Sequence, residues 1–179
     1  MRVIAGRLGG HPLIAPRGRA TRPTSDRVRE ALFSILGELS GARVLDLFAG
    51  TGALGIEALS RGAKRAVFVE RDGRALQRLA SNLEALGLQE DEAEVRRGEA
   101  LGVLRRARAC AETYDLVLID PPYRRASDLG REISVALAPL LAPKARVVVE
   151  SDRRAPLELD LPLGDERRYG DTLIRIYGP

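Results

Sequence analysis

The sequence predicts an α/β protein built on a doubly wound, mostly parallel β-sheet. Between residues 43 and 150, short apolar runs that favour strands alternate with amphipathic patterns that favour helices. Strands separated by helices imply parallel pairing with right-handed connections. Two extended runs within residues 166 to 177 flank Gly170-Asp171 with no helix between them, which predicts an antiparallel hairpin closing one edge of the sheet.

Residues 1–40 are expected to form a basic N-terminal extension, and residues 41–179 the main domain. Residues 2 to 15 indicate a short hairpin that turns at Gly9-Gly10. A basic loop follows, after which Thr24 or Ser25 is expected to cap a helix. That helix has an apolar face and an outward face bearing cations. The apolar face consists of Val28, Ala31, Leu32, Ile35, Leu36 and Leu39, and the outward face of Arg27, Arg29 and Glu30.

The elements of the main domain follow from the alternation of patterns, with no internal repeat or long linker. Strands are expected at residues 44–48, 65–70, 93–97, 114–120 and 145–150, and helices at residues 53–59, 75–86, 99–107 and 129–141.

Composition restricts the class of protein. A chain of 179 residues with 45% hydrophobic content is long enough for a single sizeable core. No apolar run reaches the roughly 18 residues of a membrane span, and the N-terminus lacks a signal-peptide core, so we expect a cytoplasmic protein. The single cysteine, Cys110, excludes an internal disulfide, and the single histidine, His11, leaves no ordinary transition-metal cluster.

The positive charge is concentrated near the N-terminus. Residues 1 to 30 contain seven arginines and only two acidic residues, whereas the rest of the chain is close to neutral. Prolines and glycines in the same stretch prevent it from being mainly a regular helix. This combination is typical of an arm that binds a polyanion, although a merely solvated basic tail is the alternative. The candidates for contacts to a nucleic-acid backbone are Arg17, Arg19, Arg22 and Arg27.

The glycine-rich turn after the first strand is a candidate ligand site. Gly50, Gly52 and Gly55 fit the spacing that lets a backbone approach a nucleotide, which also occurs in purely structural turns. Asp46 ends the preceding strand, where a carboxylate would repel the pyrophosphate of NAD or FAD and attract a sulfonium or ammonium group. The pattern therefore favours S-adenosylmethionine over a dinucleotide.

Two further carboxylates follow neighbouring strands. Ligands of open parallel sheets bind at the carboxyl ends of the strands. Glu70 ends the second strand, twenty residues after Gly50, where it can accept both ribose hydroxyls of an adenosine. Glu99 follows the third strand, where it can accept from an adenine amino group or simply be a solvated residue at a helix start.

The most specific signal is Asp120-Pro121-Pro122-Tyr123, which follows the fourth strand. The two prolines have no N–H, and their carbonyls are free to accept hydrogen bonds. Tyr123 can stack on a planar base while Asp120 and the Pro121 carbonyl accept the two hydrogens of its exocyclic amine. The nitrogen lone pair then becomes available to attack a methyl group. Arg124 and Arg125 come next and can hold the phosphates that flank a flipped-out base, or can simply be a solvated pair.

These motifs resemble those of class I methyltransferases that act on exocyclic amines of bases. The resemblance rests on DLFAGTGALG, Asp46 to Gly55, and DPPY, Asp120 to Tyr123. The segment RPTSDRVRE, Arg22 to Glu30, is similar to the one that heads the bacterial 16S ribosomal RNA guanine N2-methyltransferases of the RsmD type. The similarity extends from about Arg2 to Glu150 and into the final hairpin.

This resemblance implies a Rossmann-like class I fold with a seven-stranded sheet, and methylation by a monomer of one guanine N2 in 16S ribosomal RNA. The RNA would be part of a small subunit or an assembly intermediate. Catalytic residues would be Asp120, Pro121, Pro122 and Tyr123. The S-adenosylmethionine site would comprise Asp46, Phe48, Ala49, Gly50, Thr51, Gly52, Leu54, Glu70, Arg71, Glu99 and Ala100. Glu99 replaces the Asp that is more usual in such enzymes.

Three alternative functions remain open from the sequence. A DNA adenine-N6 or cytosine-N4 methyltransferase would use the same DPPY chemistry, but little chain is left for a domain that reads DNA sequence. A non-catalytic RNA-binding assembly factor would keep the fold without needing an intact DPPY. An NAD-dependent oxidoreductase would place the Asp46 carboxylate near a pyrophosphate.

Overall fold

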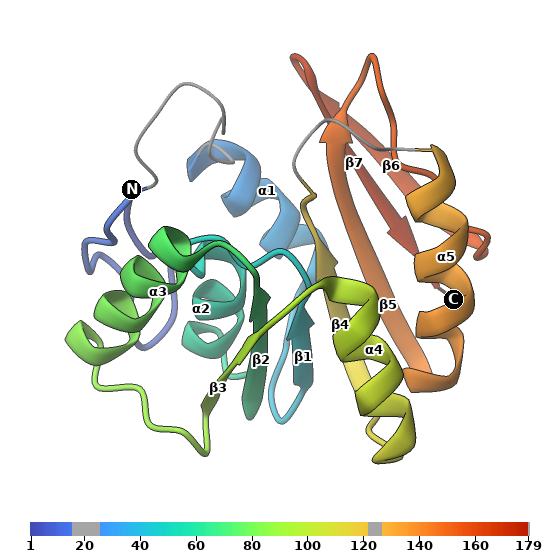
Figure 1. The fold of residues 1–179 in the computed structure, drawn as a ribbon. Helices are drawn as coiled ribbons and strands as arrows, with labels where there is room; N and C mark the ends of the chain where they lie inside the picture. Colours follow the sequence, from blue (N-terminus) through green and yellow to red (C-terminus); the bar gives the residue numbers. More distant parts are fainter. Residues whose placement is uncertain (16–25, 122–126, 179) are drawn as a thin grey trace.

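The fold is described by a computed structural model covering residues 1–15, 26–121 and 127–178. Seven strands form one sheet in the order β3-β2-β1-β4-β5-β7-β6 (Figure 1). The first five strands pair in parallel, and β6 and β7 are antiparallel, as the sequence predicts. The strands are β1 Arg43–Asp46, β2 Arg65–Glu70, β3 Ala93–Arg97, β4 Tyr114–Ile119, β5 Leu141–Asp152, β6 Leu163–Tyr169 and β7 Thr172–Tyr177.

Helices cover both faces of the sheet (Figure 1). On one face lie α1 Asp26–Leu36, α2 Ala53–Ser60 and α3 Gly73–Ala85, and on the other α4 Ala100–Ala109 and α5 Ser127–Leu137. Consecutive strand residues alternate between two separate cores, as the pleat of a strand requires. Val44 packs with the first group of helices, whereas Leu45 packs with the second. The sheet is therefore buried on both sides, as expected for parallel strands.

Residues 1–15 are packed against the main domain. An isolated antiparallel bridge joins Arg2 to Pro12, with hydrogen bonds on either side of it, so the predicted hairpin is reduced to one short pairing. Val3, Leu8 and Leu13 are buried in the same core as α1, α2 and α3. The extension and the main domain thus share one hydrophobic core.

Two expectations for the first helix are wrong. The helix ends at Leu36 and does not reach Leu39, because Gly37 adopts a φ of +66° in the left-handed region. Leu39 is nevertheless buried. Arg29, which was expected to point outward, is completely buried. It lies one turn before Leu32 and Phe33 on the buried face, where acidic side chains from α1 and α2 compensate its charge.

The fifth helix and fifth strand differ from their expected bounds. The helix ends at Leu137 and continues as one 3₁₀ turn, η1 Ala138–Leu140. Pro139 has no N–H for an α-helical hydrogen bond and disfavours helical backbone in the residue before it, which explains this ending. Strand β5 then spans twelve residues instead of the predicted six. None of the described helices combines the length and apolar character needed to cross a bilayer.

Candidate active site

The glycine turn joins β1 to α2 and is held against the elements that flank it. Gly52 precedes α2 with a φ of +88°, and a Cβ there would lie 2.4 Å from Leu79 Cδ1 on α3. A Cβ on Gly55 would lie 2.3 Å from Cε1 of the Phe68 ring on β2. Both distances are far below a van der Waals contact, so a side chain at either position would displace a core residue. The glycine spacing therefore reflects close packing as well as a turn.

Asp46 lies beneath this turn, with only 1% of its surface exposed. Its Oδ2 accepts a hydrogen bond from the Gly55 N–H at 3.0 Å. Its Oδ1 is buried and has no hydrogen-bond partner in the described part of the chain. Burial raises the pKa of Asp46 to about 7, the Gly55 hydrogen bond opposes this rise, and the Glu70 charge adds to it. One carboxylate oxygen is thus left to pair with a cationic ligand.

Glu70 lies beside the same turn. Its Oε2 accepts from the Gly50 N–H at 2.9 Å, and its Oε1 accepts from the N–H groups of Arg71 and Asp72 at 2.7 and 2.8 Å. The carboxylate therefore connects the glycine turn to the loop that follows β2. Each carboxylate oxygen has two lone pairs, so Oε2 retains one for a further donor such as a ribose hydroxyl.

Glu99 and Arg71 meet at the carboxyl ends of β3 and β2. Their side chains form an ion pair of 2.9 Å, with 70% and 63% of their respective surfaces exposed. Glu99 occupies the N-cap position of α4 without capping it through its side chain, and Ala100 behind it is buried. Glu99, the residue expected to contact an adenine, thus faces solvent and is paired with Arg71.

Asp120 lies immediately after β4, at the same edge of the sheet. The register pairs Asp46 of β1 with Leu118 and pairs Ile119 with Val149 of β5. The pKa of Asp120 is raised well above its usual range, first by burial and then by the negative charges of Glu150 and Asp46. Carboxylates from three adjacent strands thus converge where the glycine turn and the Asp-Pro-Pro loop begin.

The structure describes some of the predicted site residues and not others. Pro121 follows Asp120 and is partly buried, and Arg27 on α1 is exposed. Among the expected cofactor contacts, Phe48 is partly buried, whereas the side chains of Ala49, Thr51 and Leu54 are buried, the last in the core under α2. Outside the described residues lie Arg17, Arg19, Arg22, Pro122, Tyr123, Arg124 and Arg125.

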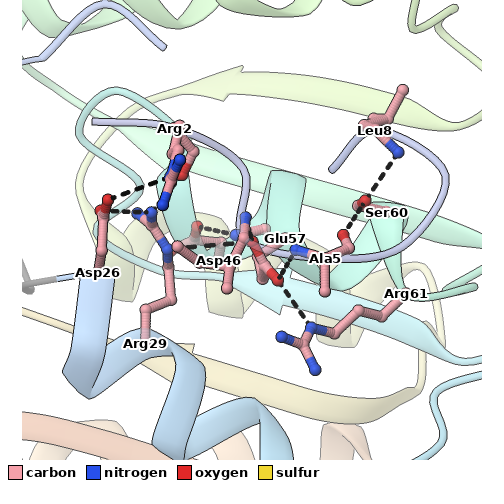
Figure 2. A network of polar contacts seen from close by, with 11 residues as sticks. Arg2, Ala5, Leu8, Asp26, Arg29, Asp46, Glu57, Ser60 and Arg61 are labelled. Carbon is pink, nitrogen blue, oxygen red and sulfur yellow. Dashed lines mark hydrogen bonds and ion pairs between the residues drawn. The ribbon is translucent and has the colours of Figure 1, made fainter. Parts of the chain in front are cut away.

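The N-terminal segment is attached to α2 by a polar network that sequence reasoning missed (Figure 2). The carboxylate of Glu57 accepts from the Ile4 N–H at 2.7 Å, the Ala5 N–H at 3.2 Å and Arg61 Nε at 2.7 Å. Arg29 lies with its Nε 4.0 Å from Glu57 and donates to Asp26 and to the Arg2 carbonyl. The only available sequence signal was a charged residue within the otherwise apolar helix ALGIEALS.

Two pockets lie at the amino ends of the strands, opposite the candidate site, and are separate from it. One, of about 220 Å³, is lined by residues at the amino ends of strands, including Arg43, Arg65 and Tyr114. Two of its arginines pair with glutamates, Arg65 with Glu94 at 2.7 Å and Arg96 with Glu112 at 2.8 Å. The other, of about 340 Å³, contains Asp115 and Lys144. In the described residues, no group of three or more His, Cys, Asp or Glu is arranged to hold a metal ion.

Comparisons with known proteins identify relatives over the whole chain. A family model described as Conserved hypothetical protein 95 matches residues 1–178. Ribosomal RNA small subunit methyltransferase D of Escherichia coli K12 is 40% identical over 187 residues, covering 99% of this chain and 89% of its own. Bacillus subtilis YlbH, itself only provisionally named an rRNA methyltransferase, is 39% identical over 181 residues, covering 99% and 98%. The solved structure of a hypothetical protein from Thermus thermophilus superposes with a TM-score of 0.85 at 31% identity, covering 100% and 99%.

Proposed function

Because the chain belongs to the family described as Conserved hypothetical protein 95, which includes ribosomal RNA small subunit methyltransferase D, we propose that it methylates the exocyclic N2 of a guanine in 16S ribosomal RNA. Membership of this family makes the protein an S-adenosylmethionine-dependent rRNA methyltransferase. The target base, the target atom and the roles of individual residues are our proposal. We further propose that it acts as a monomer on a small subunit or an assembly intermediate.

The observation that carries the proposal is the convergence of Asp46, Asp120 and the glycine turn at one edge of the sheet. In this arrangement Asp46 pairs with the cationic part of S-adenosylmethionine through its unpartnered Oδ1. Glu70 accepts from the ribose, and Glu99 lies near the adenine. Asp120, one residue beyond β4, would hold the amine from the adjacent strand. The cofactor and the amine would thus be held by neighbouring strands.

The reaction is a direct displacement. S-adenosylmethionine, held by Asp46 and Glu70, would supply an electrophilic methyl group to the N2 lone pair and would leave as S-adenosylhomocysteine. Asp120 and the Pro121 carbonyl accept the two amine hydrogens and so orient the lone pair, while Tyr123 stacks on the base. The extra proton on N2 leaves after the methyl group has moved, and the raised pKa of Asp120 suits it to receive that proton.

Positioning is expected to contribute more than proton transfer. General acid–base assistance is worth about 10²–10⁴ in rate, whereas holding two reactants in attack geometry corresponds to effective molarities of about 10⁵–10⁸ M. The sulfonium methyl group is already reactive and the base amine is weakly nucleophilic, so alignment matters most. Asp120 therefore acts first as an acceptor that holds the amine.

The test is methyl transfer from labelled S-adenosylmethionine to small ribosomal subunits from cells that lack the activity, with duplex DNA assayed in parallel. The RNA and DNA are then digested to nucleosides. Label in N2-methylguanosine is the expected result. Label in N6-methyladenine or N4-methylcytosine from DNA would contradict the proposed substrate, and cofactor binding without any transfer would favour a non-catalytic assembly factor.

A further inference from the structure

Glu150 is a buried carboxylate near the carboxyl end of β5, with only 2% of its surface exposed. Val148, two residues before it, and Ile174, its partner on β7, both belong to the core that lies under α1. Alternate residues of a strand, and residues directly opposite on a neighbouring strand, point to the same face of a sheet. The Glu150 side chain therefore lies on the face that α1 covers.

Asp120 lies beside Glu150 at the same edge of the sheet. Ile119 pairs with Val149 in the parallel register of β4 and β5, so the residues that follow them, Asp120 and Glu150, are level with each other. Neighbouring strands are only about 4.8 Å apart. Asp120 is partly exposed, whereas Glu150 is buried. Of the two carboxylates, Asp120 is thus the one that a substrate amine can reach.

The buried Arg29 of α1 lies over this end of β5. Arg146 of β5 donates to the carbonyl of Leu36, the last residue of α1, and so fixes the helix along the strand. From that contact, Arg29 is about 10 Å away along the helix and Glu150 is about 13 Å away along the strand. A helix and a strand that run together from one contact therefore bring these two charged groups to the same level.

The charges of Arg29 and Glu150 act on each other. Figure 2 shows the Arg29 guanidinium between Asp26 and Glu57, at 3.0 Å and 4.0 Å. Its Nη1 is buried and has no hydrogen-bond partner among the residues that the structure describes. Burial lowers the pKa of Arg29, and the negative charges of Asp26, Glu57 and Glu150 oppose this. By the same attraction, Arg29 favours the ionised form of Glu150.

We propose that Glu150 is a positioning residue for Asp120 in methyl transfer, and that Arg29 is the counter-ion that keeps Glu150 charged. This inference rests on the proposed function, because it requires Asp120 to hold the amine. Two adjacent buried carboxylates resist being ionised together. With Glu150 held negative by Arg29, Asp120 is the carboxylate that takes up the proton released from N2. Arg29 and Glu150 thus assign the role of proton acceptor within the pair.

Other charged groups also face this pair, and the experiment has to separate their effects. In the described chain they are Asp46 of β1, which acts on Asp120, and Asp26 of α1 and Glu57 of α2, which act on Arg29. Saturating S-adenosylmethionine keeps Asp46 in its ligand-bound state at every pH. The remaining pH dependence of transfer then reports on Asp120.

The experiment is single-turnover methyl transfer from saturating S-adenosylmethionine to unmethylated small subunits, measured as a function of pH. The rate should rise with pH as Asp120 loses its proton. Glu150→Gln keeps the size of the side chain and removes its charge, so this rise should move to lower pH by about one unit or more. Glu150→Asp keeps the charge and should leave the rise near its original pH.

Glu57→Gln is the matched control. It also removes a buried carboxylate beside Arg29, but Glu57 is not among the charges that act on Asp120, so the pH profile should stay in place. Far-UV circular dichroism establishes that each variant is folded, and calorimetry should find the affinity for S-adenosylmethionine within a few-fold of the original. A structural role alone would not move the pH profile of Glu150→Gln and spare that of Glu57→Gln.

Urea unfolding tests the counter-ion without measuring activity. Arg29→Met and Glu150→Gln each leave a buried charge with less compensation, whereas the double variant removes both charges. The double variant should therefore be less destabilised than the sum of the two single variants.

Each failure has a distinct pattern. The inference is wrong, and the proposed function unaffected, if the pH profile of folded Glu150→Gln stays in place, or if Glu57→Gln or Glu150→Asp shifts it equally. Additive free energies of unfolding would remove Arg29 as the counter-ion. If the unmodified protein transfers no methyl group to subunits, the proposed function is wrong and the inference is wrong with it. If Glu150→Gln does not fold, the pH profile of the double variant decides the outcome.

Discussion

Asp46 is a buried carboxylate whose pKa differs from that of an exposed aspartate. Its pKa is about 7 in the folded protein and 3.8 in the absence of burial. The folded state therefore binds this proton more tightly than the unfolded state, and the contribution of Asp46 to stability is lost as the pH rises from about 4 to about 7. A sulfonium or ammonium group beside Oδ1 would favour the charged form and offset this loss.

Cofactor affinity should consequently depend on pH through Asp46. If the carboxylate must be ionised, S-adenosylmethionine should bind about tenfold more weakly at about pH 6 than at about pH 8, because a pKa of about 7 leaves roughly a tenth of the carboxylate charged at the lower pH. Calorimetric titration across this range measures the effect. Asp46→Asn should bind weakly at every pH with little pH dependence, and an unchanged pH profile in this variant would assign the titration to another group.

Asp120→Ala should separate catalysis from cofactor binding. Methyl transfer should fall by more than about 10³-fold because the amine loses its orienting acceptor. Affinity for S-adenosylmethionine should remain within a few-fold. Single-turnover assays and equilibrium binding measure the two effects.

The control is Asp115→Ala at the exposed amino end of the same strand, where Asp115 accepts from the Arg43 N–H at 2.8 Å. A large loss of cofactor affinity in Asp120→Ala would remove Asp120 from its base-holding role.

At the scale of elements, helix α3 and strand β2 hold the glycine turn in a single arrangement. Leu79 lies against Gly52, Phe68 lies against Gly55, and Glu70 accepts from Gly50. Two elements, α3 and β2, therefore position three successive parts of one short segment. The backbone conformation of the glycine turn therefore depends on how the neighbouring side chains pack against it.

Gly55→Ala tests this packing. Gly55 is helical, so the added methyl group introduces little backbone strain, but it would overlap the Phe68 ring. Overpacking of this kind destabilises by about 1–3 kcal/mol. Phe68→Leu should create room, so the double variant should be less destabilised than the sum of the single variants. Urea unfolding of the four proteins measures the coupling. Additive free energies of unfolding would indicate that the ring moves aside without strain.

At the scale of the whole molecule, the N-terminal extension is part of the folded structure. Val3, Leu8 and Leu13 lie in the shared core, and Glu57, Ser60 and Asn82 bind the segment's backbone. Deleting residues 1–20 would therefore damage the fold as well as remove cations. The role of the arm in RNA binding is better tested by substituting its arginines.

The triple variant Arg17→Ala, Arg19→Ala, Arg22→Ala should weaken RNA binding and reduce its salt dependence. Each lost contact to single-stranded RNA should reduce the slope of log affinity against log salt by about 0.7, or about 2 for three contacts. Filter binding at several salt concentrations measures the slope. The control variant removes three exposed arginines of α4, Arg105, Arg106 and Arg108. If both variants lose the same slope, the arm acts only through net charge.

The order and type of the elements could be predicted from the sequence because hydrophobic periodicity is a local property. Periodicity predicted both bounds of β2 and of β3, and the turn residues Gly170-Asp171 predicted the final hairpin. A general rule then placed the candidate site, since parallel strands bring their carboxyl ends to one edge. Asp46, Glu70 and Asp120 could therefore be expected to lie together before any contact was known.

Contacts between distant residues decided the rest. Periodicity placed Arg29 on an outward helix face, but its burial depends on Glu57 and Asp26 being positioned to compensate its charge. The unpartnered oxygen of Asp46 depends on where the Gly55 N–H points. Asn82 bridges Ile14 and Thr51, which lie 68 and 31 residues away. Such contacts leave no periodic signal because each depends on how separate elements meet, and that meeting is set by packing around the cores.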